Sequence, residues 1–321
     1  MWIRNFVSAI EKSTLASPKL EDAIAIKENH LPKRIYKYRC DSDKSRINLT
    51  NDTVWICSPQ AYNDPYDCLF TVTEQDVVVA AKRSLIDDFV QTYKLDGIVS
   101  ADAALLAKGS NDPFRELVKY IPPSHPFPRG ANPQQMVDFL AAQLPKFIGD
   151  AIAFVHQIRD ATKICSFSQR NDSIVMWGHY ADKHRGFCIE YELESLPATH
   201  ALRRNLYPVI YSSELYDLTH WASQLFDSPR AQFNPAAVLL ALLRKYQDWR
   251  YEEEWRFILT EDHITPPRAL SVPTPTRVFL GSKIEEPSKR ELTELCRARG
   301  IEVRKMEMDP HGFKLKDSPI V

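Results

Sequence analysis

The chain has 321 residues, long enough to bury a sizeable core as one large domain or two small ones. Its 41 lysines and arginines balance 42 aspartates and glutamates, so no bulk basic field draws it to nucleic acid or to an anionic membrane. A nucleic-acid partner would need a local basic patch. The nine glycines are not clustered as a phosphate-cradling loop requires, which disfavours Rossmann and P-loop nucleotide binding.

The sequence predicts a protein that stays where it is made, which we expect to be the cytoplasm. No apolar run is long enough to span a bilayer, so we expect no membrane partner. Residues 1–10 match neither a signal peptide nor a mitochondrial presequence. The six cysteines lack CxxC spacing, which favours reduced, mostly buried thiols over a disulfide framework or a zinc site. We therefore expect no metal.

The hydrophobic patterns predict an α+β fold, with a mixed or antiparallel β core, flanking helices and a helical insertion. Residues 1–30 form an N-terminal helical segment in this interpretation. Residues 31–321 form a single core domain with the insertion at about 74–160. Strand patterns occur at 35–39, 54–57, 164–168, 186–191 and 207–211. A helix through 238–246 then leads into 249–260, and the tail is predicted as strand 277–280, helix 287–299 and strand 301–306.

Two early blocks combine aromatic and polar residues. In Tyr36-Lys37-Tyr38-Arg39, an arginine at a strand end can bind a phosphate or carboxylate through two parallel hydrogen bonds, with Tyr38 beside it. In the block 58–67, Asn63, Asp64 and Asp67 lie in a turn flanked by tyrosines. Asn-Asp-Pro is also an ordinary turn sequence, and a surface arginine is common. A structural interpretation of both blocks stays open.

The third block, residues 166–180, is rich in hydrogen-bond donors on apolar side chains. Ser166 and Ser168 share one face of a predicted strand, and Trp177 and Tyr180 follow. Neither serine has a GxSxG setting, so a triad hydrolase has little support.

The fourth block, residues 249–259, carries the sharpest signal. If it enters a strand, Glu252 and Glu254 share one face while Glu253 takes the other. Carboxylates bracketed by tryptophans are partly desolvated, so at least one should have a raised pKa unless Arg250 or Arg256 pairs with it. The alternative is a solvated surface ladder of glutamate and arginine.

Together the blocks resemble a bacterial family called domain of unknown function 2971, from about residue 31 to the C-terminal strands. The residues that carry the resemblance are Tyr36-Lys37-Tyr38-Arg39, Asn63-Asp64-Pro65-Tyr66-Asp67, Ser166-Phe167-Ser168, Met176-Trp177-Gly178-His179-Tyr180, Gly186-Phe187-Cys188 and Tyr251-Glu252-Glu253-Glu254-Trp255-Arg256. The resemblance implies a bacterial or phage cytoplasmic protein of toxin or phage-defence systems.

A looser resemblance is to the Arg, Ser, Glu layout of ADP-ribosyltransferases, which use NAD as substrate. It implies that Arg39 grips an NAD phosphate and that Ser166 or Ser168 orders the ribose site. Glu254 would stabilise an oxocarbenium-like transition state, and Glu252 would orient the acceptor or take its proton. Trp177, Tyr180 or Trp255 could stack on nicotinamide or adenine, and Arg256 completes the ligand-binding set. The acceptor macromolecule is not readable from the sequence.

Two rival functions stay open. In a metal-dependent nuclease or phosphodiesterase, Asp64, Asp67 and Glu252 or Glu254 would hold Mg²⁺, while Lys37 or Arg39 meets the phosphate. In a non-enzymatic module, the same aromatic-flanked residues would recognise a nucleotide or a protein partner.

Overall fold

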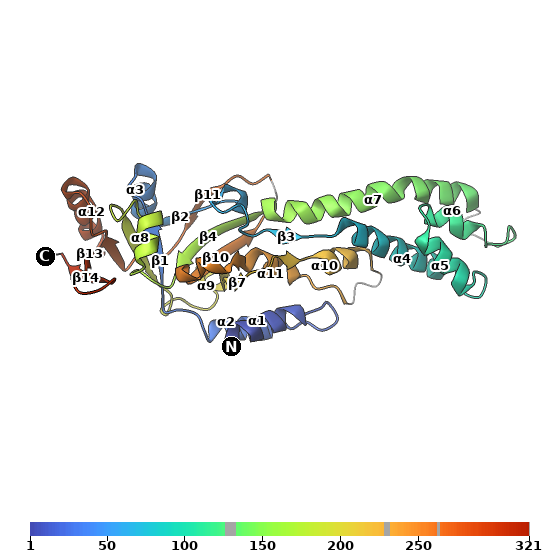
Figure 1. Cartoon of the computed structure of the whole chain (residues 1–321), viewed down its shortest axis with the longest axis horizontal. Helices are drawn as coiled ribbons and strands as arrows, with labels where there is room; N and C mark the ends of the chain where they lie inside the picture. The colour runs from blue at the N-terminus through green and yellow to red at the C-terminus, as the bar shows by residue number, and fades with distance from the viewer. Residues whose placement is uncertain (126–132, 228–231, 262–263, 321) are drawn as a thin grey trace.

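The protein is built around one large sheet and a long helical arm (Figure 1). The computed structural model describes residues 1–125, 133–227, 232–261 and 264–320. The predicted α+β class is confirmed, because helices flank a mixed sheet. The sheet order is β14 (Leu315–Pro319), β13 (Glu302–Met308), β12 (Arg277–Leu280), β5 (Phe187–Glu192), β1 (Arg34–Arg39), β4 (Thr162–Ser168), β10 (Glu254–Thr260) and β6 (Leu206–Pro208).

Neighbouring strands of this sheet run antiparallel except β12 and β13, which are parallel. The helix α12 (Glu286–Ala298) makes the crossover that a parallel pair requires. The pairing between β1 and β4 is short: Tyr36 faces Ser168, and no further residue pair continues the ladder. By contrast, β10 pairs with β4 along its whole length, from Glu254 to Thr260. The sheet is therefore open between β1 and β4.

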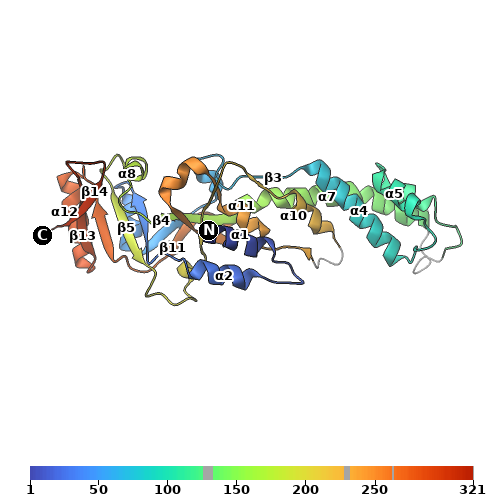
Figure 2. The same cartoon turned by 60° about the horizontal axis from the view of Figure 1, so that its bottom comes forward.

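The arm extends away from the sheet, at the end of the molecule opposite α12 and β14 (Figures 1 and 2). It has its own apolar core, to which Trp221 and Phe226 contribute from the adjoining α10 and η3. The last helix of the arm runs directly into the central strand β4. The helices are α4 (Glu74–Thr92), α5 (Ala101–Gly109), α6 (Pro113–Val118) and α7 (Pro133–Ala161), and the adjoining elements are α10 (Thr219–Ser223) and η3 (Gln224–Phe226).

Shorter elements cover the two faces of the sheet. One apolar cluster joins Ile35 of β1 to Leu292 of α12, and another joins Tyr38 of β1 to Trp177. Ile35 and Tyr38 thus show that β1 packs apolar side chains on both sides. The covering helices are α1 (Trp2–Glu11), α2 (Leu20–Glu28), α3 (Asp43–Thr50), α8 (Ile174–Tyr180), α9 (Ala201–Arg204) and α11 (Ala237–Leu243). None of the described helices is both long enough and apolar enough to cross a membrane.

Three two-stranded sheets and two 3₁₀ helices complete the described elements near the site. The pairs are β2 (Thr53–Ile56) with β11 (Arg268–Ser271), β3 (Phe70–Thr71) with β8 (Tyr216–Asp217), and β7 (Ile210–Ser212) with β9 (Arg244–Tyr246). The 3₁₀ helices are η1 (Pro59–Ala61) and η5 (Gln247–Glu252).

Two predicted element boundaries were wrong. The helix predicted through 238–246 ends at Leu243, because residues 244–246 pair as β9 with β7 instead of continuing the helical ladder. The strand predicted at 207–211 breaks at Val209, whose amide donates to the Glu254 carbonyl. Its two halves then pair with different strands, β10 and β9. The prediction of reduced, mostly buried thiols is confirmed: the six cysteines are free and four of them are buried, whereas Cys40 is exposed and Cys57 half-buried.

We expect Gly186→Ala to destabilise the fold by about 1–3 kcal/mol, as overpacking does. A Cβ on Gly186 would lie 2.1 Å from the Arg39 carbonyl oxygen at the end of β1. Thermal unfolding measures the effect. Gly109→Ala is the matched control, because a Cβ there meets nothing within 4 Å. Equal melting temperatures for the two variants would contradict the close approach of Gly186 to β1.

Candidate functional site

A cavity of about 310 Å³ lies where β1 and β4 separate. The side chain of Lys37 crosses from β1 to β4 where backbone pairing is absent, and its Nζ donates to the Ser166 carbonyl at 2.6 Å. The block 58–67 and the turn before β10 complete the walls. Among the residues predicted for a site, those lining this cavity are Tyr38, Arg39, Asn63, Asp67, Ser166, Ser168, Tyr180, Glu252 and Glu254.

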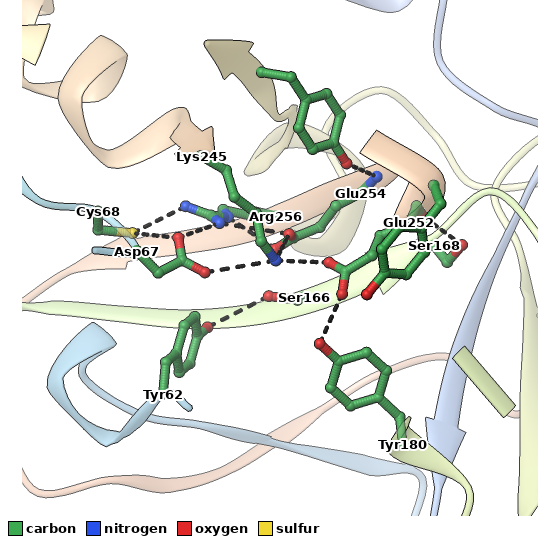
Figure 3. A network of polar contacts seen from close by, with 12 residues as sticks. Tyr62, Asp67, Cys68, Ser166, Ser168, Tyr180, Lys245, Glu252, Glu254 and Arg256 are labelled. Atoms are coloured by element: carbon green, nitrogen blue, oxygen red, sulfur yellow. Dashed lines mark hydrogen bonds and ion pairs between the residues drawn. The ribbon is translucent and has the colours of Figure 1, made fainter. Parts of the chain in front are cut away.

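Lys245 of β9 joins the carboxylates of the cavity wall (Figure 3). Its Nζ donates to Glu252 at 2.6 Å and to Glu254 at 2.7 Å, and lies 3.6 Å from Asp67 Oδ2. All four side chains are buried. Three carboxylates from two parts of the chain thus converge on one ammonium.

The two glutamates converge for a reason that differs from the predicted strand alternation. Glu252 ends the 3₁₀ helix η5, and the strand begins only at Glu254. Between them Glu253 adopts a left-handed conformation, with φ 44° and ψ 52°. Residues other than glycine rarely adopt this conformation, and one that does is held in it by contacts with its surroundings. Ser168 helps to hold it, because its hydroxyl donates to the Glu252 carbonyl at 2.6 Å.

Arg256 supports the wall from behind and does not line the cavity. It is 0% exposed, and its guanidinium contacts Asp67 at 2.5 Å and Glu254 at 2.8 Å. Its Nη1 also donates to the Leu242 carbonyl at 2.7 Å. Burial opposes ionisation, but Asp67, Cys68 and Glu254 outweigh it and raise the pKa of Arg256. The predicted ligand-binding arginine is therefore a buried partner of the carboxylates.

The two glutamates differ in their ionisation. Burial raises the pKa of Glu252 above its ordinary value, against the opposing pull of Lys245. Burial would also raise the pKa of Glu254, but ion pairs with Arg256 and Lys245 outweigh it and lower that pKa. Tyr180 donates its hydroxyl to Glu252 at 2.6 Å, and burial raises the pKa of this tyrosine. Glu254 is thus a fixed anion, whereas Glu252 is the carboxylate suited to exchanging a proton.

A second wall of the cavity is cationic and comes from β1. Arg39 Nη2 is buried, yet it has no hydrogen-bond partner among the described residues. Lys37 lies two residues earlier on the same strand, and burial lowers its pKa. An unpaired buried donor is unfavourable by about 1–3 kcal/mol, more for a charged group, so this wall is arranged for an anionic ligand.

The block 58–67 is anchored to the arm. Arg159, in the last turn of α7, donates to the carbonyl of Pro65 at 3.1 Å and of Asp67 at 2.9 Å. Asp64 accepts from the Tyr66 amide at 2.9 Å, as a turn aspartate does, and lines an adjoining cavity. Trp177 is buried outside the site, with its ring edge-on to Tyr38 at 5.3 Å. Asp64, Trp177 and Arg256 are therefore the predicted site residues that the first cavity does not include.

Several residues of the site were not among the predicted site residues. Lys37 was considered only for the metal-dependent alternative, although it lies two residues before Arg39 on a predicted strand and so shares its face. Lys245 had no readable signal, because it was assigned to a helix. Tyr62 lines the cavity near Ser166, with 3.5 Å between the two hydroxyl oxygens. Within the described ranges, no group of three or more His, Cys, Asp and Glu side chains is placed to hold a metal ion.

Residues 176–257 match the model of a family described as a protein of unknown function, DUF2971. The resemblance to DUF2971 is confirmed. The comparisons with curated proteins and with solved structures gave no match. The DUF2971 match contains Tyr180, Lys245, Glu252, Glu254 and Arg256, and so covers most of the carboxylate wall. The blocks that supply the cationic wall and Asp67 lie outside the matched residues. The resemblance described from the sequence had included them, because it ran from about residue 31.

Removing the buried arginine should strongly destabilise the fold. We expect Arg256→Met to lower the free energy of unfolding by about 3–5 kcal/mol, because Asp67 and Glu254 would lose their buried partner. Denaturant unfolding measures this loss. Arg115→Met, at an exposed ion pair of the arm, is the control and should change stability by less than about 1 kcal/mol. Similar losses in both variants would show that the Arg256 network does not stabilise the fold.

The opposite pKa shifts predict opposite pH dependence. Because the pKa of Glu254 is lowered in the folded chain, this residue adds stability at pH values above its ordinary pKa of 4.5, and the stability is lost as the pH falls through the folded pKa. The raised pKa of Glu252 adds stability below 4.5 that is lost as pH rises through its folded pKa. The test is the free energy of unfolding of Glu254→Gln, Glu252→Gln and the native chain, measured from acid to neutral pH. The difference in this free energy between each variant and the native chain should change with pH in opposite directions for the two variants. Parallel curves would contradict this assignment.

Proposed function

We propose that the protein is an ADP-ribosyltransferase-like enzyme that uses NAD as substrate. One observation carries the proposal: a cationic wall from β1 and a carboxylate wall from η5 and β10 line the same cavity. The strands β1 and β10 lie on either side of β4 in the sheet order. A dinucleotide carries an anionic pyrophosphate and a glycosidic bond whose cleavage builds positive charge. The two walls match these two requirements.

The cationic wall is suited to the pyrophosphate. Arg39 offers an unused buried N–H, and Lys37 retains donors beyond the one bonded to Ser166. Arginine is suited to phosphate because its planar fork bonds two oxygens at once. Binding would also relieve the unpaired Arg39 donor.

The carboxylate wall is suited to the reacting sugar. As the bond to nicotinamide breaks, its electron pair leaves with nicotinamide and positive charge develops on the ribose. Asp67, Glu252 and Glu254 outnumber Lys245 and Arg256, so the cluster carries excess negative charge in a buried setting when Glu252 is ionised. Fixed charge in a site that excludes water stabilises such a transition state more than solvent does. Glu254 supplies this fixed charge, and Glu252 takes the proton of the acceptor.

The Mg²⁺-dependent alternative has one specific observation for it, the convergence of Asp67, Glu252 and Glu254. The ammonium of Lys245 holds the centre of that convergence, within 3.6 Å of each carboxylate. A metal would have to displace a buried cation that is already paired. The geometry therefore favours glycosidic chemistry over phosphodiester cleavage.

We expect NAD to raise the melting temperature of the native chain and, with water in place of the acceptor, to be cleaved to nicotinamide and ADP-ribose, measured by chromatography. Arg39→Ala should remove the thermal shift, because ligand binding stabilises by mass action. Glu252→Gln should keep the shift but slow cleavage roughly 100-fold or more, as loss of a general base does. The rate should rise with pH as Glu252 loses its proton, through a pKa above its ordinary 4.5. Glu254→Gln should also abolish cleavage.

The matched control is Glu253→Gln, because this exposed neighbour pairs only with Arg170 among the described residues. It should cleave NAD at the native rate. A thermal shift with Mg²⁺ and none with NAD would replace the proposal by the phosphodiesterase. A nucleotide shift without any product would identify a binding module.

A further inference from the structure

A second cavity of about 520 Å³ adjoins the first beside the carboxylate wall. The two cavities share Asn63 and Lys245, whereas Lys37 and Arg39 line only the first. Lys245 also holds both glutamates, so the carboxylate wall stands next to both spaces. The second cavity is lined by residues 63–66, 212–215, 244–246 and Trp249.

Three aromatic side chains, Tyr66, Tyr246 and Trp249, line this second cavity. Tyr66 is 62% exposed and Tyr246 is 46% exposed, although rings of this size are usually buried more deeply. The ring of Trp249 lies below Lys245, with 5.1 Å between Nζ and the ring centroid. Exposed rings around a cavity offer a stacking surface for a planar ligand.

Arg244 lines this cavity and carries a buried donor, Nε, without a partner among the described residues. Its guanidinium lies over the Tyr216 ring at 5.3 Å, which restricts its orientation. A buried donor left unpaired is unfavourable, so the site would gain from a ligand with a hydrogen-bond acceptor.

The charges of the second cavity indicate what kind of ligand fits. Asp64 and Glu214 line it together with Arg244 and Lys245, so anionic and cationic side chains are equal in number. A polyphosphate would meet carboxylates there, and the whole chain has no basic excess to attract a nucleic-acid polymer. A planar, uncharged group with hydrogen-bond acceptors fits the rings, the arginine and the balance of charge. A nucleobase has these properties.

We propose that the second cavity is the acceptor subsite and that it binds a nucleobase, free or within a nucleoside. This inference rests on the proposed function of the first cavity. In the transfer, the bond from ribose C1′ to nicotinamide breaks and its electron pair leaves with nicotinamide. A nitrogen or oxygen of the bound base then bonds to C1′, and the proton from that atom goes to the Glu252 carboxylate. An adjoining acceptor site makes the enzyme a transferase rather than a hydrolase.

Nucleoside binding tests the subsite without any turnover. Titration calorimetry with adenosine, guanosine, cytidine and uridine, in the absence of NAD, should show binding of at least one of them. Tyr66→Ala and Tyr246→Ala should each weaken that binding roughly tenfold, since a base–aromatic stack contributes about 1–3 kcal/mol. Tyr120→Ala, which removes a 40% exposed ring from the arm, is the control and should bind like the native chain.

Nucleosides that fail to bind, or that bind equally to all variants, would overturn the subsite. With NAD added, the bound nucleoside should gain the mass of one ADP-ribosyl group, and Tyr246→Ala should lose this product while still releasing nicotinamide. Transfer to single-stranded oligonucleotides but not to nucleosides would overturn the choice of a small acceptor. Because nucleoside affinity is measured without NAD, the subsite and NAD cleavage fail or succeed separately.

Discussion

The buried ammonium of Lys245 is the contact on which the site depends. It joins Asp67, which follows η1, to Glu252 at the end of η5 and Glu254 at the start of β10, almost two hundred residues later in the sequence. Arg256 ties two of the same carboxylates together from behind. Buried ion pairs of this kind add little net stability over apolar packing, but removing one partner is severe because it leaves an unpaired charge. The network therefore fixes the geometry of one cavity wall more than it stabilises the fold.

The opening between β1 and β4 turns this wall into a site. A continuous ladder would have filled the space with backbone hydrogen bonds; instead, Lys37 bridges to Ser166 and Arg39 keeps an unused N–H. The arm also contacts this site, because Arg159 at the end of α7 donates to the carbonyl of Asp67 in the turn that carries this carboxylate. Two basic side chains, a carboxylate cluster and a second cavity with three aromatic rings thus adjoin one another, and the proposed transfer would need two substrates held together in this way.

Local sequence patterns foresaw part of this. Alternation placed β1, β4 and β10, and the polar blocks on them were expected to converge, as nine of the predicted residues do around one cavity. The rest depended on tertiary contacts that leave no local trace. Glu252 and Glu254 point to the same place through the left-handed conformation of Glu253 and not through strand alternation, because the 3₁₀ helix η5 extends to Glu252, directly before this turn. Lys245 was hidden in an apolar run that continues a helical pattern, and it lies in β9 only because β7 offers a strand to pair with. Arg256 looked like a ligand residue, but the depth of its burial could not be read from the neighbouring residues.

The most direct measurement is a crystal structure of the Glu252→Gln variant with NAD, in which slowed cleavage preserves the substrate. We expect a phosphate oxygen within hydrogen-bond distance of Arg39 Nη2 and of Lys37, with the nicotinamide ribose beside residue 252. A dinucleotide whose phosphates lie away from β1, or whose ribose lies far from the carboxylate wall, would contradict the proposed chemistry.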